Sequence, residues 1–228
     1  MTHARHRWSL LGASLLALAA ATCPLRAAHA CSPRPVVPAT VKAPVDGQVV
    51  SAFACKDAEG EHLFVETRQQ PAPVAGKVQP AELTFYKFSL LPTGPVKRWQ
   101  ARDFSPIDER ASAPTRSQTR TARTDRFTAR DVDGDGIAEA FIAYTLPGQA
   151  PNPDDGKLLV FYKDRKFAIR GAVAPTPGDF GSRTLDAGFG TLPVAIQNHA
   201  LTLWDTVALP KGAAGAPSSI TITQAPEH

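Results

Sequence analysis

The chain has 228 residues and a formal net charge of +4, which at first suggests an anionic partner such as a nucleic acid. Three of its arginines lie in an N-terminal segment of thirty residues that we expect to be removed, and this segment has no acidic residue. The remaining 198 residues carry 22 basic and 21 acidic side chains, a net charge of +1, so charge no longer supports nucleic-acid binding. Their number is sufficient for one domain with a hydrophobic core.

The first thirty residues have the features of a secretory signal peptide. Basic residues near the start precede an apolar run from Leu10 to Ala21, which is too short to span a membrane, and the small-x-small sequence Ala28-His29-Ala30 follows. We expect residues 1–30 to be cleaved and the protein to be periplasmic or secreted by Gram-negative-type export, with no transmembrane segment left. Lipid anchoring at Cys31 is not expected, because Ala28 stands where a lipobox needs leucine.

Two of the three cysteines, Cys31 and Cys55, remain after cleavage. In an exported protein the default for such a pair is a disulfide, which here ties an N-terminal arm to a strand. A catalytic thiol has little support, because the sequence contains no C-x-x-C motif.

The mature chain reads as a Pro-rich arm at residues 31–46 and one β domain at residues 47–209. Segments rich in β-branched and aromatic residues, bounded by Gly, Pro and Asp turns, predict strands. The expected strands are residues 47–55, 61–68, 82–90, 96–102, 126–130, 140–145, 157–162 and 166–170.

Two parts of the C-terminal third allow more than one interpretation. Residues 192–196 and 200–205 fit either two strands or one short helix. The tail at residues 210–228 is small and polar and is expected to be disordered, although residues 220–222 suit an edge strand.

Residues 103–125 differ from the rest, because they lack large apolar side chains after Ile107 and are rich in Ser, Thr, Ala and Arg. We interpret this stretch as a solvated flexible loop. The alternative is an electrostatic contact of Arg116, Arg120 and Arg123 with an anionic glycan or a lipopolysaccharide phosphate. No aromatic residues interleave the arginines, which argues against single-stranded nucleic acid.

Residues 131–139 read D-x-D-x-D-G-x-x-E and carry the strongest chemical signal in the sequence. Four carboxylates this close repel one another, and oxygen ligands at this spacing suit the hard cation Ca²⁺. The alternative is a solvated Asp/Gly turn without an ion. The expected ligands of a structural Ca²⁺ are the side chains of Asp131, Asp133, Asp135 and Glu139 and the backbone carbonyl of Ile137.

The acidic stretch is not an EF-hand loop. An EF-hand needs a bidentate acid at position 12, which here is Ile142, and the flanking residues read as strands. The unit resembles the calcium loops of FG-GAP and VCBS repeats, although Glu139 stands where those repeats usually have Asp. Two further acids, Asp154 and Asp155, lie in a Pro/Gly-rich turn and are either additional ion contacts or ordinary turn residues.

Three elements together resemble a family of exported bacterial proteins, some of which are labelled as surface polysaccharide biosynthesis proteins. They are the acidic loop, the sequence K-L-L at residues 157–159 and the sequence K-F-A-I-R-G at residues 166–171. The resemblance covers residues 80–208 and implies a link to the cell envelope. It implies no catalytic residue.

The residues that usually carry catalysis are few. Outside the leader the histidines are His62, His199 and His228, and a lone histidine near a strand is more often a surface or core residue than a catalyst. The sequence contains no G-x-S-x-G and no H-E-x-x-H motif. Carboxylates that hold Ca²⁺ are not free to act as a glycosidase acid/base pair.

We therefore expect a mostly β, single-domain antiparallel meander or sandwich, propeller-blade-like, with a calcium-type loop between two strands. One acidic loop in a chain of this length excludes a full propeller of such repeats. The expected function is that of an exported, non-catalytic calcium-binding protein with a cell-envelope role. The alternatives are a binding module for an anionic surface polysaccharide and an envelope glycan-processing enzyme.

Overall fold

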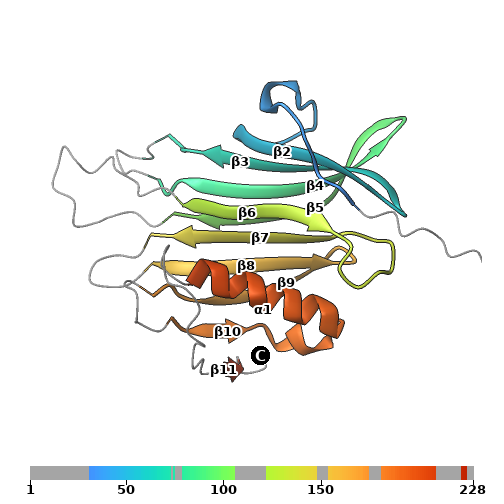
Figure 1. Ribbon diagram of the computed structural model, residues 1–228. Helices are drawn as coiled ribbons and strands as arrows, with labels where there is room; N and C mark the ends of the chain where they lie inside the picture. The colour runs from blue at the N-terminus through green and yellow to red at the C-terminus, as the bar shows by residue number, and fades with distance from the viewer. Residues whose placement is uncertain are drawn as a thin grey trace, which may run out of the picture.

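The strands of the chain form two stacked sheets, and one α-helix covers the outer face of the second sheet (Figure 1). The predicted antiparallel β fold is thereby confirmed. The computed structural model describes residues 31–72, 74, 79–105, 122–147, 154–174, 181–208 and 222–224.

The first sheet is an antiparallel meander in which neighbours in the sequence are neighbours in the sheet. In sheet order its strands are β1 (Arg34–Pro35), β2 (Gln48–Asp57), β3 (Gly60–Gln69), β4 (Glu82–Leu91) and β5 (Gly94–Phe104). Strands β2 to β5 match the expected segments to within three residues at each end, whereas β1 lies in the arm, where no strand was expected.

The second sheet repeats this meander, and only its last pair, β10 with β11, is parallel. Each meander has the up-and-down connectivity of a propeller blade, and the two pack face to face around one core. The strands are β6 (Arg123–Arg130), β7 (Glu139–Leu146), β8 (Asp155–Tyr162), β9 (Arg165–Ala172), β10 (Arg183–Leu185) and β11 (Ile222–Gln224).

Aromatic rings hold the two sheets together. Phe127 of the second sheet meets Phe53 and Phe85 of the first edge-on, with ring centroids 5.0 and 5.2 Å apart. Trp99 stacks on Phe161 across the same interface. These contacts bury the alternating apolar residues of both sheets in one shared core.

The outer face of each sheet is covered as well. Helix α1 (Val194–Ala208) places Ile196, Ala200 and Trp204 on the second sheet, against apolar residues such as Phe141. On the first sheet the arm around the 3₁₀ helix η1 (Pro38–Thr40) packs against the outward-facing apolar residues. Strand β7, covered on both faces, buries every residue, which explains why its sequence reads as a nearly continuous apolar run.

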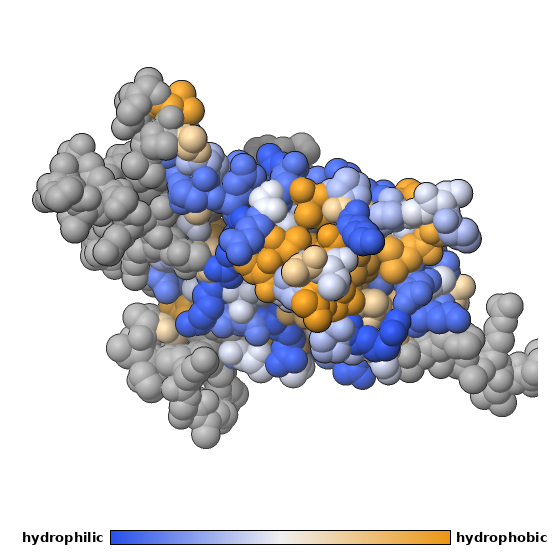
Figure 2. All heavy atoms as spheres, turned by 90° about the horizontal axis from the view of Figure 1, so that it is seen from above, coloured by the Kyte–Doolittle hydropathy of each residue, from blue (hydrophilic) through white to orange (hydrophobic). Residues whose placement is uncertain are grey.

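The arm leaves some apolar surface in contact with solvent. Figure 2 views the molecule from the side of β2 and the arm, and an apolar area lies there inside a hydrophilic border. Val37, next to η1, is 65% exposed. The disulfide between Cys31 and Cys55 is present and ties the start of this arm to β2, with Cα atoms 5.4 Å apart.

The segment that fits either strands or a helix is helical. Its buried residues Ile196, Ala200, Leu203 and Trp204 follow the helical spacing of three and four rather than the strand spacing of two. A second 3₁₀ helix, η3 (Ala187–Thr191), precedes α1. No helix among the described residues is long and apolar enough to cross a membrane.

Several expectations lie wholly or partly outside the described residues. They include the signal peptide at 1–30 and most of the tail at 210–228. Strand β11 (Ile222–Gln224) overlaps the expected edge strand at residues 220–222 only in Ile222. The Arg-rich loop is shorter than expected at both ends. Strand β5 continues to Phe104, which pairs with Glu82 of β4, and β6 begins at Arg123, which pairs with Thr145 of β7. Residues 106–121 are not described.

The K-F-A-I-R-G element is strand β9, and its final glycine has a steric reason. A Cβ atom on Gly171 would lie 1.7 Å from the carbonyl oxygen of Ser182. Only glycine therefore allows the chain before β10 to approach β9 this closely.

We expect the double variant Cys31→Ser, Cys55→Ser to lower the free energy of unfolding by about 3 kcal/mol, because the disulfide closes a loop of 24 residues. Urea denaturation monitored by tryptophan fluorescence would measure the loss. Reduced wild type is the matched control and should unfold at the same urea concentration as the variant. An unchanged midpoint in the variant would show that the apolar contacts of the arm suffice to hold it.

Candidate metal centre

The acidic loop connects β6 to β7 at one end of the sandwich. Arg130 and Glu139 are paired across the two strands and close the loop. Gly134 and Gly136 have φ angles of 79° and 86°, in the left-handed region that other residues rarely adopt. The two glycines thus allow the eight residues between Arg130 and Glu139 to turn within a compact hairpin connection.

The aspartates of the loop fold the backbone around their own carboxylates. Asp131 accepts hydrogen bonds from the N–H groups of Gly134 and Gly136, at 2.7 and 3.0 Å. Asp133 accepts the N–H of Asp135 at 3.2 Å, and Asp135 accepts the N–H of Ile137 at 2.9 Å. These are Asx-type turns, and they shape the loop without requiring an ion.

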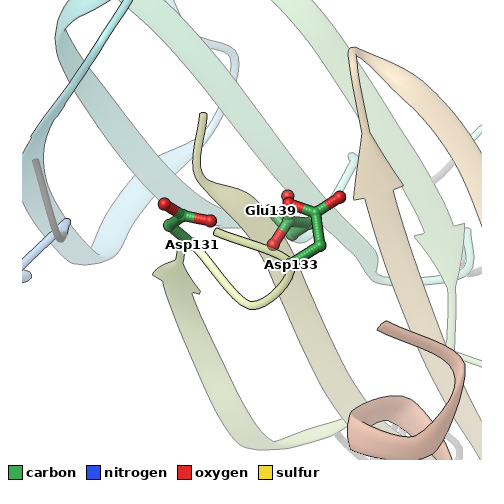
Figure 3. A group of neighbouring side chains, drawn as sticks. All are labelled: Asp131, Asp133 and Glu139. Atoms are coloured by element: carbon green, nitrogen blue, oxygen red, sulfur yellow. The ribbon is translucent and has the colours of Figure 1, made fainter. Parts of the chain in front are cut away.

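Three carboxylates converge within the loop. One oxygen each from Asp131, Asp133 and Glu139 lies within 4.8 Å of the others, and Figure 3 shows Asp131 facing the other two across the loop. The backbone N–H of Val132 donates to Oε2 of Glu139 at 2.8 Å. Oxygen Oε1 of Glu139 is buried and has no hydrogen-bond partner. One of the three converging carboxylates, that of Glu139, therefore has a buried acceptor without a partner.

Glu139 is in an unfavourable environment for a charge. It is 1% exposed. Burial, together with the neighbouring charges of Asp133, Asp135 and Asp131, raises the pKa of Glu139 to about 8, against the opposing effect of the Val132 hydrogen bond. A hard cation among these oxygens would remove the repulsion and satisfy Oε1, so the residues present fit such an ion.

The expected ligand Asp135 lies outside the converging set. Its Oδ2 is 3.1 Å from Nζ of Lys163, which belongs to the turn between β8 and β9. The role of the Ile137 carbonyl stays a prediction, since only carboxylates make up the converging set.

The loop is attached to the first sheet by a residue that the sequence analysis missed. Oδ2 of Asp57, at the end of β2, accepts the N–H of Ala138 at 3.1 Å, and the N–H of Ala58 donates to the carbonyl of Gly136 at 2.8 Å. The partners are 81 residues apart in the sequence, so nothing local identifies Asp57.

A hydrogen-bonded chain keeps Asp57 in place. Its Oδ1 accepts the N–H of Glu59 at 2.8 Å and lies 3.0 Å from Nε2 of His62, whose Nδ1 lies 3.3 Å from Oγ of Ser89. Burial alone would raise the pKa of Asp57, but the hydrogen bonds from His62, Ala138 and Glu59 outweigh it and hold this pKa below its usual range.

The two described histidines, His62 and His199, both contact other side chains of the fold. His62 is 1% exposed and serves the contact between Asp57 and Ser89, so it is a core residue. His199 on α1 meets the ring of Phe141 edge-on at 4.7 Å, and burial, with the charges of Arg130 and Arg126, lowers its pKa. His228 lies outside the described residues.

Asp154 and Asp155 lie far from the loop. Asp155 is paired with Leu146, at the end of β7 opposite to Glu139. The full length of β7 therefore separates these acids from the converging carboxylates, and their interpretation as additional ion contacts is wrong.

The proposed anion contacts are only partly described. Arg116 and Arg120 lie outside the described residues. Arg123 begins β6, and its Nε lies 2.8 Å from Oδ1 of Asp125. Its charge is therefore already paired within the protein.

Comparison of the chain with protein-family models, with curated proteins and with solved structures gives no match.

We expect Asp57→Asn to lower the free energy of unfolding by about 1–3 kcal/mol at pH 7, because a buried charged acceptor of three hydrogen bonds is lost. The pKa of Asp57 is lower in the folded than in the unfolded chain, so its contribution is present above about pH 4 and is lost as the pH falls through the folded value. Urea denaturation at pH 7 and pH 3 should thus show a smaller difference between wild type and variant at the lower pH. An equal difference at both would contradict this assignment.

Proposed function

We propose that this chain is an exported, non-catalytic calcium-binding protein that acts at the cell envelope. The observation that supports the ion most directly is the buried, unpaired Oε1 of Glu139, whose carboxylate converges with those of Asp131 and Asp133. A buried carboxylate oxygen without a partner is costly, and a bound cation removes that cost.

Calcium is the ion that best suits this loop. The available side-chain ligands are all oxygens, which hard cations prefer, and the spacing of residues 131–139 wraps them around one point. Mg²⁺ requires a near-ideal octahedron and gives up its water reluctantly, whereas Ca²⁺ tolerates irregular sets of six to eight oxygens. An irregular cluster of three carboxylates supplemented by backbone and water oxygens therefore favours Ca²⁺.

Export is supported by the disulfide and by the leader-like N-terminus. A disulfide between Cys31 and Cys55 fits an oxidising compartment. Calcium is abundant outside the cytoplasm, where a site with a Kd of about 10⁻⁴ to 10⁻³ M is occupied. The envelope role rests on the sequence resemblance, and in this proposal the ion stiffens the end of the sandwich without taking part in a reaction.

Asp133→Asn tests the ion site while keeping the hydrogen bond that shapes the loop, because an amide oxygen can still accept the N–H of Asp135. At a calcium concentration of about 100 times Kd, wild type should gain about 2.7 kcal/mol in its free energy of unfolding, and the variant should gain much less. In chelator the two should melt at the same temperature, or the variant slightly higher, since one repulsive charge is gone.

Differential scanning calorimetry in calcium, in magnesium and in chelator measures these differences. Asp205→Asn on α1 is the control, because its 47% exposed carboxylate lies near the opposite end of β8 and should leave the calcium effect unchanged. If wild type melts identically with and without calcium up to millimolar concentrations, residues 131–139 are an ion-free turn and the proposal fails.

Lys163→Met tests whether the ion and Lys163 compete for Asp135. The ammonium lies 3.1 Å from Oδ2 of Asp135, so its removal frees a fourth carboxylate and removes a repulsive positive charge. Calcium titration calorimetry at low salt should show an affinity about two- to fivefold higher than wild type. Lys166→Met, which removes an exposed lysine of β9, should change the affinity less. A weaker affinity of Lys163→Met would instead mean that the ion pair pre-organises the loop.

A further inference from the structure

A furrow lined by both polar and apolar side chains lies between the two sheets, at the end of β6 that is far from the acidic loop. Its larger part is a cavity of about 460 Å³, with Ser51 on β2, Glu66 and Arg68 on β3, and Thr124 and Asp125 on β6 among its lining residues. A second cavity of about 230 Å³ shares Arg68 as a wall. Together they reach the size range of ligand sites in proteins.

Two β-bulges open the furrow. The register of β2 shifts between Val49 and Ser51, and that of β6 shifts between Thr124 and Arg126. The extra residue of each bulge, Val50 or Asp125, lines the larger cavity. Each bulge bends its strand and interrupts regular pairing, and the two lie on opposite walls of one opening.

A buried carboxylate forms the base of the furrow. The side chain of Glu66 is only 5% exposed, and its Oε1 accepts hydrogen bonds from Arg68 at 3.1 Å and from the hydroxyl of Thr124 at 2.8 Å. Thr124 belongs to the second sheet, so this contact joins the two walls. The three hydrogen bonds of the carboxylate within the described structure all go to Oε1, which leaves Oε2 as an acceptor.

Arg68 supplies donors to both cavities. A guanidinium has five N–H donors, and Arg68 uses its Nε and Nη2 groups on Glu66. Its side chain is 34% exposed, so the rest of the planar group is accessible. The smaller cavity adds the amides of Gln48 and Gln69 and the carboxylate of Glu82.

The charges of the larger cavity cancel. Arg68 and Arg126 are balanced by Glu66 and Asp125, and Asp125 also pairs with Arg123 just outside. A net positive surface for an anionic ligand is therefore absent from the described lining. The lining of the larger cavity combines planar carboxylate and guanidinium groups with the apolar side chains of Val50 and Phe127.

We propose that this furrow binds a short, uncharged saccharide. Vicinal hydroxyls donate and accept at the spacing that carboxylate, guanidinium and amide groups present, and the C–H face of a sugar ring can rest on the apolar wall. The furrow and the acidic loop lie at opposite ends of β6, so the saccharide site does not depend on the calcium site.

The test is an NMR titration of the isotope-labelled protein, in calcium, with cellotriose, maltotriose, mannotriose and triacetylchitotriose, and with trigalacturonate as the anionic comparison. At least one neutral trisaccharide should bind with a Kd of about 1 mM or lower and shift the amide signals of residues 66–69 and 124–126. Calcium binding is measured separately, so failure here leaves the ion site untouched.

Two variants separate binding from folding. Arg68→Met keeps the side-chain stem and should weaken binding at least about tenfold, equivalent to about 1.4 kcal/mol. Gln69→Ala changes an exposed residue that cannot unfold the protein, and should weaken it by a smaller factor. Arg34→Met, whose exposed partner is Glu61 on the surface, is the matched control and should bind as wild type does.

Three results would overturn the proposal. One is the absence of shifts around the furrow with every neutral trisaccharide at about 10 mM, a concentration that detects even weak binding. Another is tighter binding of trigalacturonate than of any neutral sugar, which would assign the furrow to anions. The third is equal binding by wild type and by folded Arg68→Met.

Discussion

The burial of β7 on both faces is the constraint on which the rest of the structure depends. All eight residues from Glu139 to Leu146 are buried, because the first sheet covers one face of the strand and α1 covers the other. Seven of the eight suit this environment. The eighth, Glu139, is a carboxylate, and its position as the first residue of a fully enclosed strand explains both its raised pKa and its unpaired oxygen. The candidate metal centre is thus a consequence of how the sandwich is closed.

Three turns from both sheets meet at that end of the molecule. The acidic loop is hydrogen-bonded to Asp57, at the end of β2 where the β2–β3 turn begins, and forms an ion pair with Lys163 of the β8–β9 turn. In the latter turn Lys163 and Asp164 have φ angles of 48° and 60°, the conformation of a type I′ hairpin turn that non-glycine residues adopt at a cost. Hydrogen bonds from Lys87 and Arg98 of the first sheet to Asp164 offset part of this conformational cost. The loop is therefore held to both sheets by polar contacts, hydrogen bonds to the end of β2 and an ion pair with Lys163.

The sequence predicted the strands well, because their turns are marked by Gly, Pro and Asp and because edge and core strands differ in apolar pattern. It also predicted the acidic loop, whose chemistry is local. The sequence did not distinguish helix from strand for residues 192–205, because short apolar runs fit both periods. The segment is a helix whose apolar residues pack on the second sheet, and this contact is not visible in the local sequence. The attachment by Asp57, the diversion of Asp135 to Lys163 and the distance of Asp155 from the loop all depend on pairings between remote segments.

The buried carboxylates at the two ends of the sandwich are compensated in different ways. At both ends a carboxylate is buried, and an unpaired buried charge is expensive. Glu66 lies on the face of β3 that packs against the second sheet, whereas Glu139 lies on the face of β7 that carries Phe141 and is covered by α1. Glu66 is neutralised by Arg68 and bonded by Thr124, so the furrow is complete without an ion and keeps its remaining donors for a ligand. Glu139 has a backbone N–H for one oxygen, and the other acids around it add to the repulsion. A compensated carboxylate favours an uncharged polar ligand and an uncompensated one favours a cation, which is why we assign different chemistry to two acidic positions of one fold.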